Sequence, residues 1–169
     1  GFGGTLGFSI SFRRQALGDV ATTFPAFMPF LDAALMPDCN AFILNPLVVA
    51  EGRGVGPHVD GSLGNYSDTI GCPALVSVLY VQVPEGLEGG QLRLLRRGRE
   101  LARVTPTPRT LLHFRGDLSH EVTSVAGDTP QMGTARISLV VEQYRLSAAD
   151  YALVRDYSFS STAMKKYQP

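Results

Sequence analysis

The sequence shows no excess of charge of either sign. Fifteen Lys and Arg residues balance fifteen Asp and Glu residues, so the formal net charge at pH 7 is zero. Proteins that bind nucleic acid through its phosphates usually carry a basic excess. The composition therefore gives no clear indication of a nucleic acid partner.

One segment is nevertheless rich in arginine. Six arginines lie within a short span, namely Arg93, Arg96, Arg97, Arg99, Arg103 and Arg109. A hairpin whose charged side chains are solvated is the usual reason for such a cluster, and we favour it here. A surface for an acidic substrate or for nucleic acid is the alternative.

Long hydrophobic runs and cysteine motifs are also missing. No apolar run reaches the roughly 18 residues that a membrane-spanning helix requires, and no signal peptide is visible. We therefore expect no membrane partner and, by default, a cytoplasmic location. The only two cysteines, Cys39 and Cys72, form no Cys-x-x-Cys motif and are too few for a disulfide framework. We expect two free thiols, with a single bridge as the alternative.

Helical patterns are absent from most of the chain, which is organised as short strands from Asn40 onward. Eight apolar or alternating runs are bounded by Gly, Pro and Asp. Helices long enough to connect parallel strands are missing between them, so the pattern favours a mainly β sandwich or barrel. The expected strands are 40–49, 56–61, 74–83, 90–96, 100–104, 109–115, 119–125 and 133–145.

The two ends of the chain add elements outside this β core. Residues 8–12 alternate as a half-buried strand does, and residues 24–35 have apolar side chains near helical spacing. We expect a closing helix from Ser147 to Tyr157 with Ser147 as its cap, followed by a polar tail over 158–169.

With 169 residues and no visible linker, the chain is expected to form a single domain, 1–169. It divides into an N-terminal strand and packing helix (1–38), a barrel core (40–145) and a C-terminal helix and tail (146–169).

The most informative motif is His58-Val59-Asp60. On a strand, two residues at this spacing point to the same face, so an imidazole and a carboxylate come together. The motif alone is weak, because it needs a further ligand, and His120 can supply one from a later strand. Two His and one carboxylate leave three positions open on an octahedral metal, as non-haem Fe(II) oxygenases require.

A second group of polar residues lies inside apolar strands. Arg136 and Ser138 share one face of the last strand with Val140, and both need partners if they are buried. A dicarboxylate ligand would supply these partners. On the strand 74–83, Tyr80 shares a face with Val76 and could present its hydroxyl at the end of an apolar pocket.

Other motifs carry less weight. The glycines at 52, 54 and 56 precede a strand and no Gly-Lys-Ser/Thr follows, so we favour a tight turn over a phosphate-binding loop. His113 is expected to be a structural or surface residue. The loop 61–73 follows the metal motif directly, and it is either a lid that grips substrate or a plain surface connection.

Taken in order, these residues resemble the Fe(II)- and 2-oxoglutarate-dependent dioxygenase superfamily, specifically its prolyl-hydroxylase-like branch. The matching segments are Gly56-Pro57-His58-Val59-Asp60, Val78-Leu79-Tyr80-Val81, Glu88-Gly89-Gly90-Gln91-Leu92, Phe114 through Val122, and Arg136-Ile137-Ser138. The resemblance implies a double-stranded β-helix, that is, a jelly-roll or cupin-like barrel, with flanking helices at both ends. It also implies that Fe(II) is held by His58, Asp60 and His120, and 2-oxoglutarate by Arg136, Tyr80 and Ser138.

The chain departs from the family pattern at several positions. The spacing from His120 to Arg136 is longer than usual and includes the segment 128–130. Asn45 and Val48 stand where relatives often carry a Tyr that faces the cosubstrate. Glu142 stands where the branch that repairs alkylated nucleic acids carries a second Arg, which argues against that branch.

The resemblance implies hydroxylation of a C–H bond with release of succinate and CO2, O2 as oxidant and ascorbate as a candidate reductant. Related halogenases replace the carboxylate at Asp60 with a small residue, so the Asp favours hydroxylation.

The substrate would be a peptide, a protein or a small molecule, with peptidyl proline as one candidate. Two alternatives stay open: a non-catalytic barrel that binds a metal or ligand as a sensor or interaction module, and a cupin-like metalloenzyme that does not use 2-oxoglutarate. The sequence does not indicate an oligomeric state.

Overall fold

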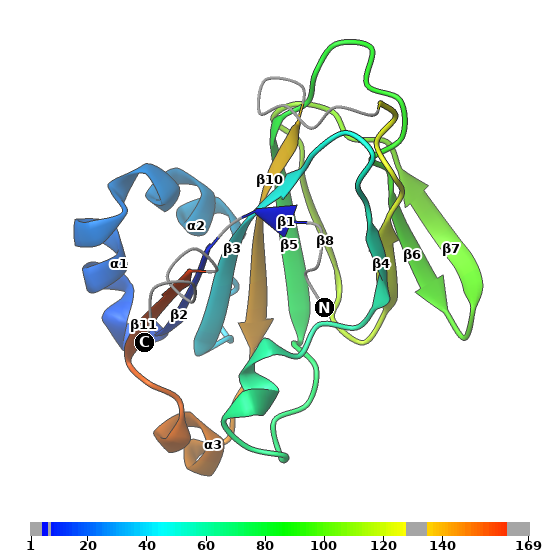
Figure 1. The fold of residues 1–169 in the computed structure, drawn as a ribbon. Helices are drawn as coiled ribbons and strands as arrows, with labels where there is room; N and C mark the ends of the chain where they lie inside the picture. The colour runs from blue at the N-terminus through cyan, green and yellow to red at the C-terminus, as the bar shows by residue number, and fades with distance from the viewer. Residues whose placement is uncertain (1–4, 7, 128–134, 162–169) are drawn as a thin grey trace, which may run out of the picture.

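A computed structural model of the chain describes residues 5–6, 8–127 and 135–161, and it consists mainly of two antiparallel sheets (Figure 1). The larger sheet has the strand order β11-β2-β3-β10-β5-β8, with β1 also paired to β3. The smaller sheet has the order β4-β9-β6-β7. The mainly β fold class predicted from the sequence is therefore confirmed.

The strands lie close to the ranges that the apolar runs predict. In the larger sheet they are β1 (Thr5–Leu6), β2 (Phe8–Arg13), β3 (Ala41–Val49), β5 (Leu75–Gln82), β8 (Leu111–Arg115), β10 (Arg136–Tyr144) and β11 (Tyr157–Ser161). In the smaller sheet they are β4 (Val55–His58), β6 (Leu92–Arg96), β7 (Arg99–Val104) and β9 (Ser119–Val122). Residues 133–134 of the last predicted strand lie outside the described residues.

The N-terminal helices cover one face of the larger sheet, at the side away from the smaller sheet (Figure 1). They are the 3₁₀ turns η1 (Arg14–Ala16) and η2 (Pro25–Phe27) and the α-helices α1 (Leu17–Thr23) and α2 (Met28–Ala34). The prediction of one continuous helix over 24–35 was wrong, because the segment forms the 3₁₀ turn η2 followed by the α-helix α2. Pro29 lacks the N–H that a continuous helix would need to bond to residue 25, so α2 starts afresh with Pro29 in its first turn.

Strand β10 is the central strand of the larger sheet and is hydrogen-bonded to β3 and β5. On one of its faces, Leu139 and Val141 pack against α1, α2 and β2 in the largest hydrophobic cluster. On its other face, Arg136, Ser138 and Glu142 point into the space between the sheets. The alternation predicted for this strand is confirmed, and it separates an apolar core from a polar site.

The C-terminal segment differs from the prediction. The closing helix α3 (Ala148–Leu153) is capped by Ser147, whose hydroxyl accepts a hydrogen bond from the Asp150 amide at 3.1 Å, as expected. The helix ends earlier than predicted, and residues 157–161 form β11, which pairs with β2. Phe159 explains this strand, because its ring stacks on Phe24 and packs against Phe8 at a tilt. The tail beyond residue 161 lies outside the described residues.

Five of the six clustered arginines lie on the β6–β7 hairpin, as predicted, whereas Arg109 lies in the turn before β8. The two central turn residues of the hairpin, Arg97 and Gly98, both have positive φ angles (50° and 76°), the geometry of a type I′ turn. Arg93 and Arg103 both form ion pairs with Glu100 on the hairpin. Charge pairing on a solvated hairpin thus accounts for part of the cluster.

Two smaller predictions concern thiols and membranes. Cys39 is buried and Cys72 is exposed, and both are free. None of the helices in the described part of the chain is both long and apolar enough to span a membrane.

Candidate metal and ligand site

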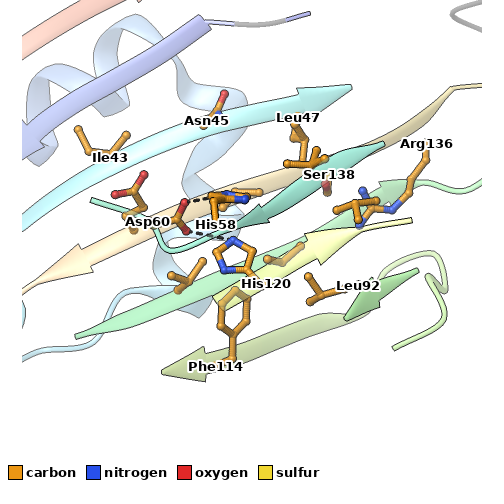
Figure 2. Close-up of a pocket in the computed structure, with 16 residues that line it drawn as sticks. Ile43, Asn45, Leu47, His58, Asp60, Leu92, Phe114, His120, Arg136 and Ser138 are labelled. Atoms are coloured by element: carbon orange, nitrogen blue, oxygen red, sulfur yellow. Dashed lines mark ion pairs between the residues drawn. The ribbon is translucent and has the colours of Figure 1, made fainter. Parts of the chain in front are cut away.

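A pocket opens between the two sheets, with the predicted site residues along its walls (Figure 2). It contains about 580 Å³ of space, part of which is open to solvent. Five of the six predicted site residues line it: His58, Asp60, His120, Arg136 and Ser138. The sixth, Tyr80, packs directly against the Arg136 guanidinium, with its ring centre 4.7 Å from the guanidinium carbon.

Strand pairing in the smaller sheet brings the two histidines together. His58 is the last residue of β4 and lies opposite His120 of β9, and their ring centres are 4.3 Å apart. The Asp60 carboxylate lies between them, 3.3 Å from His58 Nε2 and 3.5 Å from His120 Nε2 (Figure 2). The three ligand atoms all lie within 4.8 Å of one another, so one metal ion could contact all three.

Backbone carbonyls orient both imidazoles. His58 Nδ1 lies 2.9 Å from the Gly56 carbonyl oxygen, and His120 Nδ1 lies 3.3 Å from that of Leu118. A carbonyl can only accept, so each Nδ1 carries the proton and each Nε2 keeps its lone pair for a metal.

The two imidazoles differ in how they titrate. The hydrogen bond that protonated His58 donates to the Asp60 carboxylate raises the pKa of His58, and burial lowers the pKa of His120. Burial thus favours the neutral form of His120, which is the form that ligates a metal. His58 is the ligand from which a metal would displace a proton more often.

Glycines before the metal motif allow the two strands to approach. A Cβ atom on Gly54 would lie 2.6 Å from the Val122 carbonyl oxygen, and Gly52 has a φ angle of +70°. The predicted tight turn is therefore present at Gly52, whereas Gly54 is needed for close contact with β9. This second role was not predicted.

A second group of polar atoms lies at the deep end of the pocket. Arg136 is 1% exposed, and Tyr80 and Ser138, which face each other across β5 and β10, are fully buried. Arg136 Nε and Nη1, the Tyr80 hydroxyl and the Ser138 hydroxyl have no hydrogen-bond partner among the described residues. Buried donors are rarely left without an acceptor, and burial lowers the pKa of this guanidinium. A guanidinium and two hydroxyls match the acceptors of a ligand carboxylate.

The Gly-Gly turn before β6 makes room for Arg136. A Cβ atom on Gly90 would lie 3.1 Å from Arg136 Cδ, and one on Gly89 would lie 1.9 Å from the Ser124 carbonyl oxygen. Both glycines have positive φ angles, +65° and +79°. Sequence reasoning identified this turn by resemblance alone, and the structure supplies its physical reason.

Glu142 lies in the pocket, although the sequence pointed to it only as evidence against the branch that repairs alkylated nucleic acids. It is 4% exposed, lines the pocket and accepts hydrogen bonds from Ser62 and Tyr144. Burial, and then the negative charge of Asp60, raise the pKa of Glu142 to about 7. A Glu inside a strand that is otherwise mostly apolar was the available signal.

The remaining positions singled out in the sequence do not belong to the metal triad. His113 is hydrogen-bonded to the Ser77 hydroxyl at 2.7 Å, which agrees with a structural role. Asn45 lines the pocket from β3. The loop 61–73 begins with the 3₁₀ turn η3 (Ser62–Asn65), and both Leu63 and Ile70 are buried in one hydrophobic cluster. This part of the loop is packed against the barrel.

Comparisons with known proteins bear on the fold. No family model matches the chain, and no curated protein matches it. Among solved structures, it resembles an oxidoreductase of the 2OG-Fe(II) oxygenase family from Burkholderia pseudomallei, with a TM-score of 0.50 and 16% identity over 81% of this chain and 58% of that chain. It also resembles a prolyl-4-hydroxylase from Pseudomonas putida, with a TM-score of 0.50 and 23% identity over 84% of this chain and 74% of that chain.

These similarities confirm, at the level of the fold, the resemblance seen in the sequence. The chain spans 58% of the length of the Burkholderia protein, which is therefore considerably longer.

Replacing Glu142 with Gln should make the metal-free protein less sensitive to pH. The pKa of Glu142 is about 7 in the folded protein and ordinarily 4.5, so its proton stabilises the fold below pH 4.5, and this contribution is lost as the pH rises through 7. The unfolding free energy of Glu142→Gln, relative to that of the wild type, should therefore rise by on the order of 2 kcal/mol between pH 4.5 and 7.5. Urea denaturation across this range measures it; a difference that does not change with pH would contradict the prediction.

Proposed function

We propose that the protein is an Fe(II)- and 2-oxoglutarate-dependent oxygenase that hydroxylates a C–H bond of its substrate and releases succinate and CO2. One observation carries the proposal. A potential metal triad lines the same pocket as a buried guanidinium, two of whose nitrogens have no hydrogen-bond partner among the described residues. A cosubstrate with a metal-chelating end and a distal carboxylate would contact both.

The residues of the triad suit Fe(II). His58, Asp60 and His120 offer two imidazole nitrogens and a carboxylate oxygen, which is the facial triad of non-haem iron oxygenases. Bound Fe(II) would supply the oxygen-activating chemistry, with O2 as oxidant and ascorbate as a candidate reductant. Because Asp60 is a ligand-forming carboxylate, hydroxylation is favoured over halogenation.

The deep end of the pocket suits 2-oxoglutarate. Arg136 would bind the distal carboxylate through its planar fork of donors, and the Tyr80 and Ser138 hydroxyls would donate to the same group. The apolar side chains of Val78 and Val140, which line the pocket, would exclude water from the ion pair. Binding here would give Arg136 Nε and Nη1 an acceptor, which they lack among the described residues.

The substrate would approach from the metal side of the pocket. The His58 side chain is 29% exposed, whereas Arg136 is 1% exposed, so solvent reaches the pocket beside the metal position. A peptide, a protein or a small molecule could present a C–H bond there. Peptidyl proline is the first candidate, because a prolyl-4-hydroxylase shares the fold.

Succinate formation tests the proposal. The wild-type protein with Fe(II) should convert 2-oxoglutarate to succinate, slowly without substrate and faster with a productive member of a peptide or small-molecule pool. His120→Ala should lower the rate at least 100-fold, because a two-ligand site holds iron weakly. His113→Ala is the matched control and should keep the rate, since His113 contacts Ser77 and not the triad.

Other outcomes would point to the alternatives. If the wild type binds neither Fe(II) nor 2-oxoglutarate, the proposal fails. Activity that persists in Arg136→Ala without 2-oxoglutarate would indicate a cupin-like metalloenzyme. Tight 2-oxoglutarate binding without any turnover would indicate a non-catalytic barrel.

The two glycine turns near the pocket offer a sharper test of cosubstrate binding. Gly90→Ala should weaken 2-oxoglutarate affinity about tenfold, the equivalent of ~1.4 kcal/mol, because the new methyl group displaces Arg136. Gly86→Ala introduces the same backbone strain at a φ angle of +71° but meets no atom within 4 Å, so its affinity should equal that of the wild type. Calorimetric titration measures both. Equal affinities in all three proteins would show that Arg136 does not bind the cosubstrate.

A further inference from the structure

Asp60 is held less directly than the two histidines. Strand β4 ends at His58, and residues 59–61 belong to no regular element. His58 and His120 are fixed by strand pairing and by carbonyl oxygens, as described above. By contrast, among the described residues, the two imidazoles are the only groups that contact the Asp60 carboxylate as possible donors. Its position therefore depends on the backbone that follows it.

That backbone is held by Glu142 of β10. The Glu142 carboxylate accepts hydrogen bonds from the Ser62 amide at 3.2 Å and from the Ser62 hydroxyl at 2.5 Å. Ser62 begins the turn η3 and lies only two residues after Asp60. These contacts join the turn to the central strand of the larger sheet, across 80 residues of sequence.

Neighbouring contacts hold the same carboxylate and the same turn. The Tyr144 hydroxyl donates to Glu142 and also lies 3.5 Å from the Leu63 amide. Leu63 is fully buried in a cluster with Ile43 and Tyr144. The first two residues of η3 are therefore fixed by polar and apolar contacts at once.

The placement of a carboxylate here needs an explanation. Glu142 is 4% exposed, and among the described residues no Lys, Arg or His forms an ion pair with it. Burying a carboxylate without a cation is unfavourable, and Asp60 adds repulsion. An apolar residue would suit this strand better unless the hydrogen bonds to Ser62 are needed. Glu142 supplies an acceptor to the Ser62 amide, the Ser62 hydroxyl and the Tyr144 hydroxyl.

We propose that Glu142 is a positioning residue that holds the Asp60 carboxylate at the metal position by fixing the turn at Ser62. The inference rests on the proposed function, because it concerns the same metal site. It adds a residue that neither contacts the metal ligands directly nor belongs to the cosubstrate group. Asp60 is thereby linked to the same strand that carries Arg136 and Ser138.

Metal affinity tests the proposal without relying on turnover. Co(II) or Mn(II) is titrated into the metal-free wild type and its variants, and calorimetry and the Co(II) absorption spectrum are recorded. Glu142→Ala should weaken metal binding about tenfold, as the loss of an outer contact does at other metal sites, and should alter the Co(II) spectrum. Glu142→Gln should stay within about twofold of the wild type, because an amide can accept from two donors and donate to the Ser62 hydroxyl.

A matched control separates positioning from general stability. Gln143 is the next residue on β10, is fully buried and bonds to Ala34 and Ser77 on the helix side of the sheet. Gln143→Ala should destabilise the fold and leave metal affinity unchanged. The positioning role is wrong if Gln143→Ala weakens metal binding as much as Glu142→Ala does. It is also wrong if Glu142→Gln weakens metal binding as much as Glu142→Ala does.

Hydrogen exchange makes the inference testable apart from the proposed function. In the metal-free protein, Glu142→Ala should speed amide exchange over residues 60–65 at least tenfold, whereas Glu142→Gln and Gln143→Ala should not. If Glu142→Ala does not fold, Tyr144→Phe removes one donor and should show a smaller change in the same segment. A wild type that binds no metal would overturn the proposed function; unchanged exchange in Glu142→Ala or Tyr144→Phe would overturn the positioning role alone.

Discussion

The structure depends on strand β10 being buried on both faces. Its pairing with β3 and β5 fixes the register, and its alternation then decides where each side chain goes. Leu139 and Val141 hold the helices on one face, while Arg136 and Ser138 enter the pocket on the other. A slip of one residue would turn the guanidinium to the opposite face of the sheet, which carries the apolar core. The large buried core thus stabilises the position of a group that is unfavourable to bury.

The smaller sheet contributes the metal ligands under a different constraint. β4 is only four residues long, so its pairing with β9 is supported by few hydrogen bonds. Close approach at Gly54 and the carbonyls behind each imidazole compensate for this shortness. Asp60 lies beyond the end of the strand, and its support comes from the opposite sheet. The pocket therefore combines two metal ligands that are fixed by strand pairing, His58 and His120, with a third, Asp60, whose position depends on the turn after it.

Much of this arrangement could be predicted from local patterns. The strands follow a period of two, because each has one face on a core, and the His-x-Asp spacing follows from the same rule. Where the prediction was wrong, tertiary contacts overrode the local pattern. Residues 157–161 form a strand because Phe159 packs against Phe8 of β2 and against Phe24, which precedes η2, and no local signal indicates these contacts. The sequence used Glu142 only to argue against one branch of the family, because its partner Ser62 lies 80 residues away in the chain.

The sequence by itself determined the mainly β class, the alternation of β10 and the types of donor at the site, since these depend on side-chain chemistry and short-range periodicity. Only the tertiary structure decided that His58 lies opposite His120, that Gly90 gives room to Arg136, and that Glu142 holds the turn after Asp60. Each of these is a contact between segments far apart in the chain. Such contacts depend on how two sheets pack, and no single segment encodes that packing.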